Sequence, residues 1–480
     1  MLANAEAMSP QDPELIRLKA YIEGMETVEM LLNLDRPVMQ SEVDQAAYAM
    51  SQADMLIRVA PESADGHVLK GQLYASLDRL ELAGASIDTA IAIEPENSFA
   101  WVRRGLLLYN TYQSTEEPAD LDAAFAALER ARTLDPASKW PPLWLGILEY
   151  EANLDDAAAM SRYEEALAND PEFTLAMQGV GDIHLYNEDF ESSEAMYWSI
   201  LKLEPDNARA WRSLGFILGY QDDYGPALTN ARIATEKDPN QLEAWLLRGL
   251  VAYEMYKRTL MRTGRLDEGL ANESIDSYSS AIRLDPRNAE GYFRRSTLHL
   301  ALGDVSSAGD DARLAVKFDP WNEDARIALA DYQLRLGLEE QALDSYRSAS
   351  RLAAEYEYEH EEALAGEAEV LGRLGRHEEA EAAFNAALAA TTEDLAAVVR
   401  TRFGRYLESR GRTEEALATY VAARTEDPSY YDAWAAEADL RLSSGDVDGA
   451  RPALDQCRQL GPEAATTSRL LERAEAASEG

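Results

Sequence analysis

The chain has 480 residues and a net charge of −42, which comes from 87 acidic and 45 basic residues. A surface this acidic repels nucleic acid and anionic lipid, so neither is expected as a partner. No run of about 18 apolar residues occurs, so no direct membrane insertion is expected.

Hydrophobic residues make up 46% of the chain, and alanine supplies much of that share. Alanine favours helices, and runs of β-branched residues with period-two alternation are nearly absent. The sequence therefore predicts an all-α fold.

Residues 1–63 are expected to form an N-terminal helical cap or a degenerate repeat. An amphipathic helix is predicted at 14–34 and a second helix at about 41–59. Homodimerisation through the N-terminal helix is the alternative role. Ala3-Asn4-Ala5 looks like the end of a signal cleavage site, but such a match arises easily by accident in an alanine-rich chain. The expected location is cytoplasmic, with a periplasmic or extracytoplasmic location as the alternative.

From residue 64 to residue 462 the chain repeats itself, and several successive periods measure 34 residues. The marker of each period is an acidic residue followed by proline. A period of this length is typical of a solenoid built from helix pairs. The marker occurs at Glu94-Pro95, Asp135-Pro136, Asp170-Pro171, Glu204-Pro205, Asp238-Pro239, Asp285-Pro286, Asp319-Pro320 and Asp427-Pro428.

Fixed positions within the period carry one kind of residue when each proline is counted as position 32. Positions 20 and 27 hold alanine in nearly every period. Position 4 holds Trp101, Trp211, Trp245 and Trp434, position 8 holds Gly105, Gly146, Gly181, Gly215 and Gly249, and position 24 holds Tyr163, Tyr197, Tyr278, Tyr346, Phe384 and Tyr420. In this pattern the chain resembles the tetratricopeptide-repeat (TPR) family, with ten or eleven tandem repeats.

The resemblance implies a right-handed superhelical α-solenoid of antiparallel helix pairs over residues 64–462, followed by a capping helix at 463–480. Small residues at positions 8 and 20 allow the two helices of a pair to cross closely. Proline at position 32 ends the second helix, because it lacks an N–H donor.

The resemblance also implies a concave groove, lined by positions 2, 5, 9, 12 and 13 of each first helix. Repeats 2 to 7 place apolar residues there, and an exposed apolar lining usually serves a ligand. Burial by neighbouring helices is the alternative. The candidate groove residues are Phe99, Tyr109, Trp140, Tyr150, Tyr186, Phe216, Tyr220, Leu250, Tyr253 and Phe293, whereas repeats 8 to 11 place acidic residues there, among them Asp324, Asp331, Glu362, Glu369 and Asp432.

Repeat 6 carries about thirteen additional residues, and its first helix is expected to run on before turning at Gly264. The insertion holds the densest basic cluster of the chain, made of Lys257, Arg258, Arg262 and Arg265. As a projecting hairpin it is a candidate edge contact for a partner. A longer helix pair bonded to acidic neighbours is the alternative.

No pattern in the sequence indicates catalysis, a cofactor or a metal. The chain has five histidines, none three or four residues from another, and no phosphate-binding, dinucleotide-binding or serine-nucleophile motif. The single cysteine, Cys457, occupies an alanine position and is expected in the core. We therefore expect a protein that is not an enzyme.

The sequence best fits a scaffold or adaptor that binds an apolar or aromatic segment of a partner protein, with basic residues in that segment as a further option. The groove lacks the Lys and Asn pairs with which one TPR subgroup grips chaperone tails, since Val68 and Gln72 stand in those positions of repeat 1. The alternative is a non-catalytic assembly or regulatory subunit, docked by the solenoid edges and the repeat-6 hairpin. Either protein would be a monomer or part of a hetero-complex.

Overall fold

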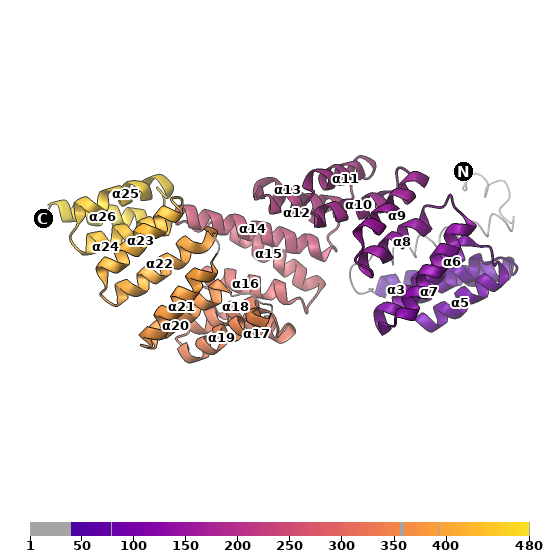
Figure 1. Cartoon of the computed structure of the whole chain (residues 1–480), viewed down its shortest axis with the longest axis horizontal. Coiled ribbons are helices and arrows are strands. Elements are labelled where there is room, and N and C mark those ends of the chain that lie inside the picture. Colours follow the sequence, from indigo (N-terminus) through magenta and orange to yellow (C-terminus); the bar gives the residue numbers. More distant parts are fainter. Residues whose placement is uncertain (1–39, 78, 356–359, 392, 480) are drawn as a thin grey trace. The chain divides into compact units, whose positions relative to one another are not determined.

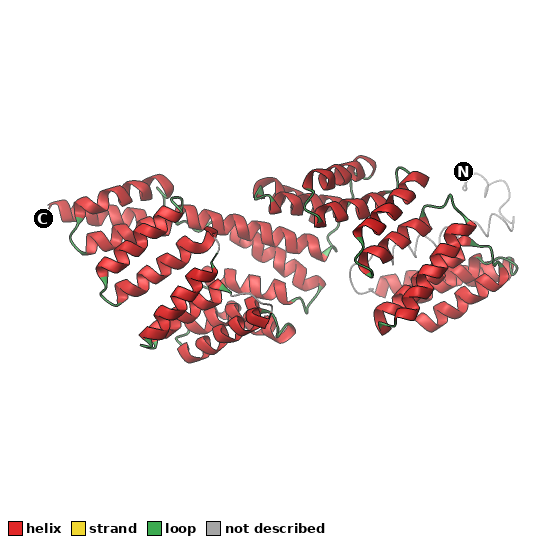
Figure 2. Ribbon diagram, viewed as in Figure 1, coloured by secondary structure: helices red, strands yellow, loops and turns green. Residues whose placement is uncertain are grey.

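A computed structural model describes residues 40–77, 79–355, 360–391 and 393–479, and these residues form helices joined by short loops, with no strand among them (Figure 2). The helix expected at 14–34 lies outside the described residues. The helices divide between two compact units, which are described separately.

Unit 1 contains the described residues up to Ile217 together with Glu236–Gln241. Its helices succeed one another along the chain in antiparallel pairs (Figure 1). They are α3 (Gln40–Val59), α4 (Asp65–Ser76), α5 (Leu80–Ile93), α6 (Ser98–Thr115), α7 (Pro118–Leu134), α8 (Trp140–Glu151), α9 (Asp156–Asn169), α10 (Thr174–Tyr186) and α11 (Phe190–Leu203). Two further helices, α12 (Ala208–Tyr220) and α13 (Tyr224–Lys237), contribute residues to both units.

Unit 2 contains Leu218–Thr235 and the residues from Leu242 onward. Its helices continue the same alternation of first and second helices, and the last one packs on α24 and α25. They are α14 (Leu242–Thr263), α15 (Glu268–Leu284), α16 (Ala289–Ala301), α17 (Val305–Phe318), α18 (Glu323–Arg335), α19 (Glu339–Glu355), α20 (Glu361–Arg373), α21 (His377–Ala390), α22 (Glu393–Ser409), α23 (Thr413–Glu426), α24 (Tyr431–Ser443), α25 (Val447–Leu460) and α26 (Ala465–Glu479).

Short polar residues cap many of the helices at their N-termini. The side chain of Asn97 accepts a hydrogen bond from the backbone N–H of Ala100 at 3.0 Å, and Asp155 accepts one from Ala158 at 2.9 Å. Such a cap stabilises a helix by about 1 kcal/mol. Asparagine recurs as the cap of first helices at 207, 288 and 322, and aspartate as the cap of second helices at 189, 267, 304 and 446.

The glycines at position 8 are required by the aromatic residue at position 24. A Cβ atom on Gly249 would lie 2.8 Å from Cε1 of Tyr278, which is closer than side-chain atoms approach one another. The same contact joins Gly146 to Tyr163 at 2.7 Å. Tyr278 is fully buried, and its ring fits between the two helices because Gly249 has no side chain.

The tryptophans at position 4 bond to the proline that ends the preceding repeat. The indole N–H groups of Trp101, Trp211 and Trp434 each donate to the carbonyl of the proline six residues earlier, at 2.9, 3.0 and 2.9 Å. Each of these bonds gives a partner to the indole N–H and to a carbonyl in the turn between two repeats. The tryptophan at position 4 and the proline at position 32, two characteristic residues of the repeat, are thus joined by one hydrogen bond.

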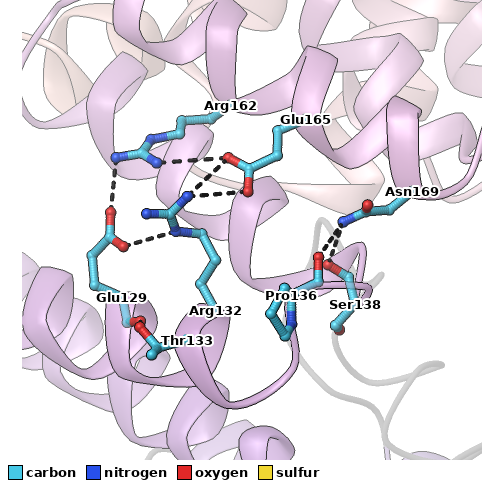
Figure 3. Close-up of polar contacts among 8 residues, drawn as sticks. All are labelled: Glu129, Arg132, Thr133, Pro136, Ser138, Arg162, Glu165 and Asn169. Carbon is cyan, nitrogen blue, oxygen red and sulfur yellow. Dashed lines mark hydrogen bonds and ion pairs between the residues drawn. The ribbon is translucent and has the colours of Figure 1, made fainter.

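Neighbouring second helices are linked by polar contacts (Figure 3). Glu129 and Arg132 of α7 alternate with Arg162 and Glu165 of α9, with ion pairs of 2.8 Å from Glu129 to both arginines and 3.2 Å from Arg132 to Glu165. The amide of Asn169 donates to the backbone carbonyls that precede α8. These side chains are partly exposed, so each pair contributes little to the stability of the stacked repeats.

The insertion in repeat 6 is packed against the C-terminal repeats and does not project. The end of α14 contacts α24 and α25, with Met261 packed beside Tyr430. A Cβ atom on Gly264 would overlap the ring of Tyr431, and Arg265 forms an ion pair of 2.6 Å with Glu463. The expectation of a projecting hairpin is therefore wrong, because the helix extension finds an apolar surface within its own unit.

Candidate functional site

Within each unit, first helices of neighbouring repeats pack side by side and form a wall. In unit 1, α4 contacts α6, α6 contacts α8 and α8 contacts α10, and in unit 2 the series α16, α18, α20, α22 and α24 is joined in the same way. The long first helix of repeat 6, α14, contacts α24 near the C-terminal end of the unit 2 series. The candidate groove residues lie on these first helices.

In unit 1 the candidate residues differ in exposure. Tyr186 is 74% exposed and Phe216 is 47% exposed. Phe99, Trp140 and Tyr150 are half-buried. Exposed aromatic rings on the wall are the part of the expected groove that a partner could cover.

Tyr109 contributes little surface to a partner. It is 7% exposed, and its hydroxyl donates to Glu151 at 2.7 Å. Burial together with the charge of Asp182 raises the pKa of the half-buried Tyr150 above its usual value, which places a carboxylate beside that ring. The aromatic surface of unit 1 is therefore also acidic.

In unit 2 the wall is mostly covered where it is apolar. Tyr220 is 59% exposed, but Leu250 and Tyr253 are half-buried and Phe293 is buried. The guanidinium of Arg294 lies over the ring of Phe293, with 5.2 Å between Cζ and the ring centroid. Of the unit 2 candidates, Tyr220 is the one that offers a large exposed ring.

Two arginines of α22 neutralise part of the negative charge on the unit 2 wall, and the sequence did not point to either of them. Arg402 forms an ion pair of 2.6 Å with Glu369, and Arg405 forms one of 2.9 Å with Asp432. Arg405 occupies position 9, so reading basic as well as apolar and acidic residues at the groove positions would have identified it. The interior of unit 2 is thus a charged network and not a uniformly acidic surface.

One carboxylate of this network stands apart. Asp331 accepts a hydrogen bond from the hydroxyl of Tyr346, and burial together with the charge of Glu362 raises the pKa of Asp331 to about 7. It also faces an open cavity of about 450 Å³ on the wall. The cavity is lined by residues of α16, α18 and α20, namely Thr297, Leu300, Ala301, Asp331, Leu334, Arg335 and Arg373.

Three of the four candidate edge residues are engaged within the chain. Lys257 pairs with Glu254 at 2.8 Å, and Arg258 pairs with Asp222 at 2.8 Å. Arg265 pairs with Glu463 as described above, while Arg262 is exposed. The arrangement matches the alternative of a longer helix pair with acidic neighbours, and an edge contact through these residues remains a prediction.

Among the residues described, no helix combines the length and the apolar character that crossing a membrane requires.

Family models of the tetratricopeptide repeat match residues 64–97, 263–325 and 401–465. These segments contain α4 and α5, the three helices α15 to α17, and the second half of α22 together with α23 to α25. The chain thus carries tetratricopeptide repeats in these segments, and its described residues form an all-α solenoid.

Relatives share the repeat at low identity. The human mitochondrial import receptor subunit TOM70 is 24% identical over 287 residues, which cover 59% of this chain and 38% of TOM70. A co-chaperone of Fusarium oxysporum with tetratricopeptide repeats and a J domain is 32% identical over 117 residues, 24% of this chain and 22% of the relative. The chain therefore spans less than two fifths of these relatives. The solved structure of yeast Tom70 aligns over 97% of this chain and 96% of its own, with 15% identity and a TM-score of 0.43.

Proposed function

We propose that this protein is a non-catalytic adaptor that binds a segment of a partner protein along the wall of first helices in unit 1. The observation that carries the proposal is the exposure of Tyr186 and Phe216 at positions 13 and 9 of consecutive first helices. Large aromatic rings gain more from burial at an interface than other side chains, at a small cost in side-chain entropy.

The surroundings of these rings favour a particular kind of segment. Asp182 lies on α10 with Tyr186, and Asp156 and Glu151 are close enough to Tyr150 to raise the pKa of its hydroxyl further. An apolar or aromatic segment with interspersed basic residues would match both the rings and the carboxylates. We propose a cytoplasmic location for this adaptor. Two relatives carry names that involve other proteins, an import receptor subunit and a co-chaperone, which supports a binding role.

The test is affinity capture from the native source with a double variant, Tyr186→Ser with Phe216→Ser. We expect the captured partner to be lost while far-ultraviolet circular dichroism stays unchanged, because both rings are exposed. Trp321→Ser is the matched control, since Trp321 is 66% exposed but lies in a loop between repeats, away from the first-helix wall.

Capture of the partner by the double variant would contradict the proposal, and so would an equal loss of capture in the Trp321→Ser control. A charge reversal of Lys257, Arg258 and Arg262 to glutamate tests the alternative of edge docking. Loss of the partner in that variant alone would replace the adaptor with an assembly subunit.

A further inference from the structure

The first helix of repeat 6 is longer than its counterparts. α14 spans 22 residues, whereas α12, α16, α18 and α24 span 13 each. Leu260 still packs on the core that α14 shares with α15. The residues after it contact the C-terminal repeats instead, with Met261 packed beside Tyr430. Residues 261–265, the α14 tip, thus pack outside their own repeat.

The backbone of the α14 tip lies directly against the turn that follows α25. A Cβ atom on Gly461 would overlap the carbonyl oxygen of Thr263, and one on Gly264 would overlap the ring of Tyr431. Gly264 also has a left-handed backbone with φ of 62°, which ends the helix. The contact therefore requires a glycine on each side.

The surface beneath the α14 tip is apolar. Met261 packs on a cluster at the junction of repeats 10 and 11, which consists of Ala397, Ala423, Tyr430 and Ala433. Val398 packs on the same cluster and stands at position 2 of repeat 10, one of the positions that the repeat pattern assigns to the concave groove. The tip therefore covers apolar surface that a ligand of the groove would otherwise reach.

The polar edge of this contact is weak. Arg265 pairs with Glu463 at 2.6 Å, but the two side chains are 61% and 73% exposed. An ion pair this exposed contributes little to stability, because solvent screens both charges. Met261, the exposed ion pair and the close approach at the two glycines together define what fits this surface. A helix end with the same features can therefore compete with the tip.

We propose that the α14 tip is an autoinhibitory contact, which covers a docking surface for a partner helix at repeats 10 and 11. The helix that it excludes ends as α14 does, with an apolar residue in its last turn, a glycine three residues later and an arginine directly after the glycine. That arginine would pair with Glu463, and the net charge of −42 favours a basic partner. Docking of an amphipathic helix on apolar surface is a common mode of recognition. The docking surface belongs to unit 2, and its occupation does not depend on the aromatic residues of unit 1.

The probe is a fluorescent peptide with the sequence of residues 250–267, and its binding to the full chain is measured by fluorescence anisotropy. Met261→Asp places a charge on the apolar cluster and should release the tip, while the surface of repeats 10 and 11 stays intact. We expect this variant to bind the peptide about tenfold more tightly than the natural chain, because a larger fraction of its molecules has an open surface. Met261→Ser, a milder change, should shift the affinity in the same direction.

A matched pair of further variants is made in the Met261→Asp background, and far-ultraviolet circular dichroism verifies that each keeps its helices. Gly461→Ala adds a Cβ atom that would overlap a carbonyl of the bound helix end, as it would that of Thr263, and should abolish peptide binding. Gly225→Ala is the control and should leave binding unchanged, since a Cβ atom on Gly225 meets nothing within 4 Å. Equal affinity of the natural chain and the two Met261 variants would overturn the inference, and so would peptide binding that survives Gly461→Ala.

Discussion

At the scale of single residues, the position-24 tyrosines show how one side chain serves two roles. The ring fills the crossing of a helix pair, and the hydroxyl emerges at the first-helix wall, where Asp182, Asp331 or Glu408 accepts from it. In repeat 6 the equivalent position 9 is Leu250, and among the described residues the hydroxyl of Tyr278 has no hydrogen-bond partner. A buried unsatisfied hydroxyl costs about 1–3 kcal/mol.

Tyr278→Phe should therefore stabilise the protein, by about 1 kcal/mol, because it removes the unsatisfied hydroxyl and keeps the ring against Gly249. Tyr197→Phe is the control, and it should destabilise the protein by about 1–2 kcal/mol through loss of the bond to Asp182. Urea denaturation midpoints measure both. A lower denaturation midpoint for Tyr278→Phe would show that the hydroxyl of Tyr278 has a partner.

At the scale of the helix pair, the turn between the two helices requires a left-handed backbone. Glycine occupies this turn at Gly303, Gly337, Gly375, Gly411 and Gly445, with φ from 72° to 85°. Repeat 4 holds Glu188 at the same place with φ of 59°. A side chain there is strained, because Cβ crowds the backbone in this region.

Glu188→Gly should accordingly raise the melting temperature, by relief of about 1 kcal/mol of backbone strain. Gly375→Ala is the reciprocal change and should lower the melting temperature, since a Cβ atom there meets nothing within 4 Å and strain is the main effect. Differential scanning calorimetry on the two variants measures both melting temperatures. A lower melting temperature for Glu188→Gly would mean that contacts of the glutamate outweigh the strain.

At the scale of the whole molecule, charge is the dominant feature. The net charge of −42 remains after all ion pairs are counted, since pairing cancels equal numbers of each sign. Repulsion among the unbalanced carboxylates destabilises the compact state. Ion pairs such as those in Figure 3 contribute little to the free energy of unfolding, because their side chains are partly exposed. Screening them with salt therefore costs the protein little stability.

The melting temperature should therefore rise with sodium chloride, mostly between about 0.01 and 0.5 M, where the screening length falls from about 30 Å to a few ångströms. Sucrose is the control, because it stabilises folded proteins without screening charge. A flat response to salt would show that the acidic surface is balanced locally.

The sequence alone determined the repeat and the class of protein. Each fixed position has a local cause: proline ends a helix, glycine admits an aromatic ring, and tryptophan bonds a carbonyl six residues away. Causes that act within 34 residues leave a periodic trace, which a sequence read by itself reveals. The expected groove residues also fell on first helices, because register fixes which face a residue occupies.

Only the tertiary structure decided which of those residues are exposed and where the chain meets itself. The packing of α14 on α24 and α25 joins Arg265 to Glu463, a contact across 198 residues that no periodicity marks. The pairing of Arg402 with Glu369 likewise depends on the angle between neighbouring repeats. Each repeat is rotated slightly against the next, and these rotations add up along the chain. The accumulated rotation decides which side chains are exposed and which distant residues pair, and no single repeat contains that information.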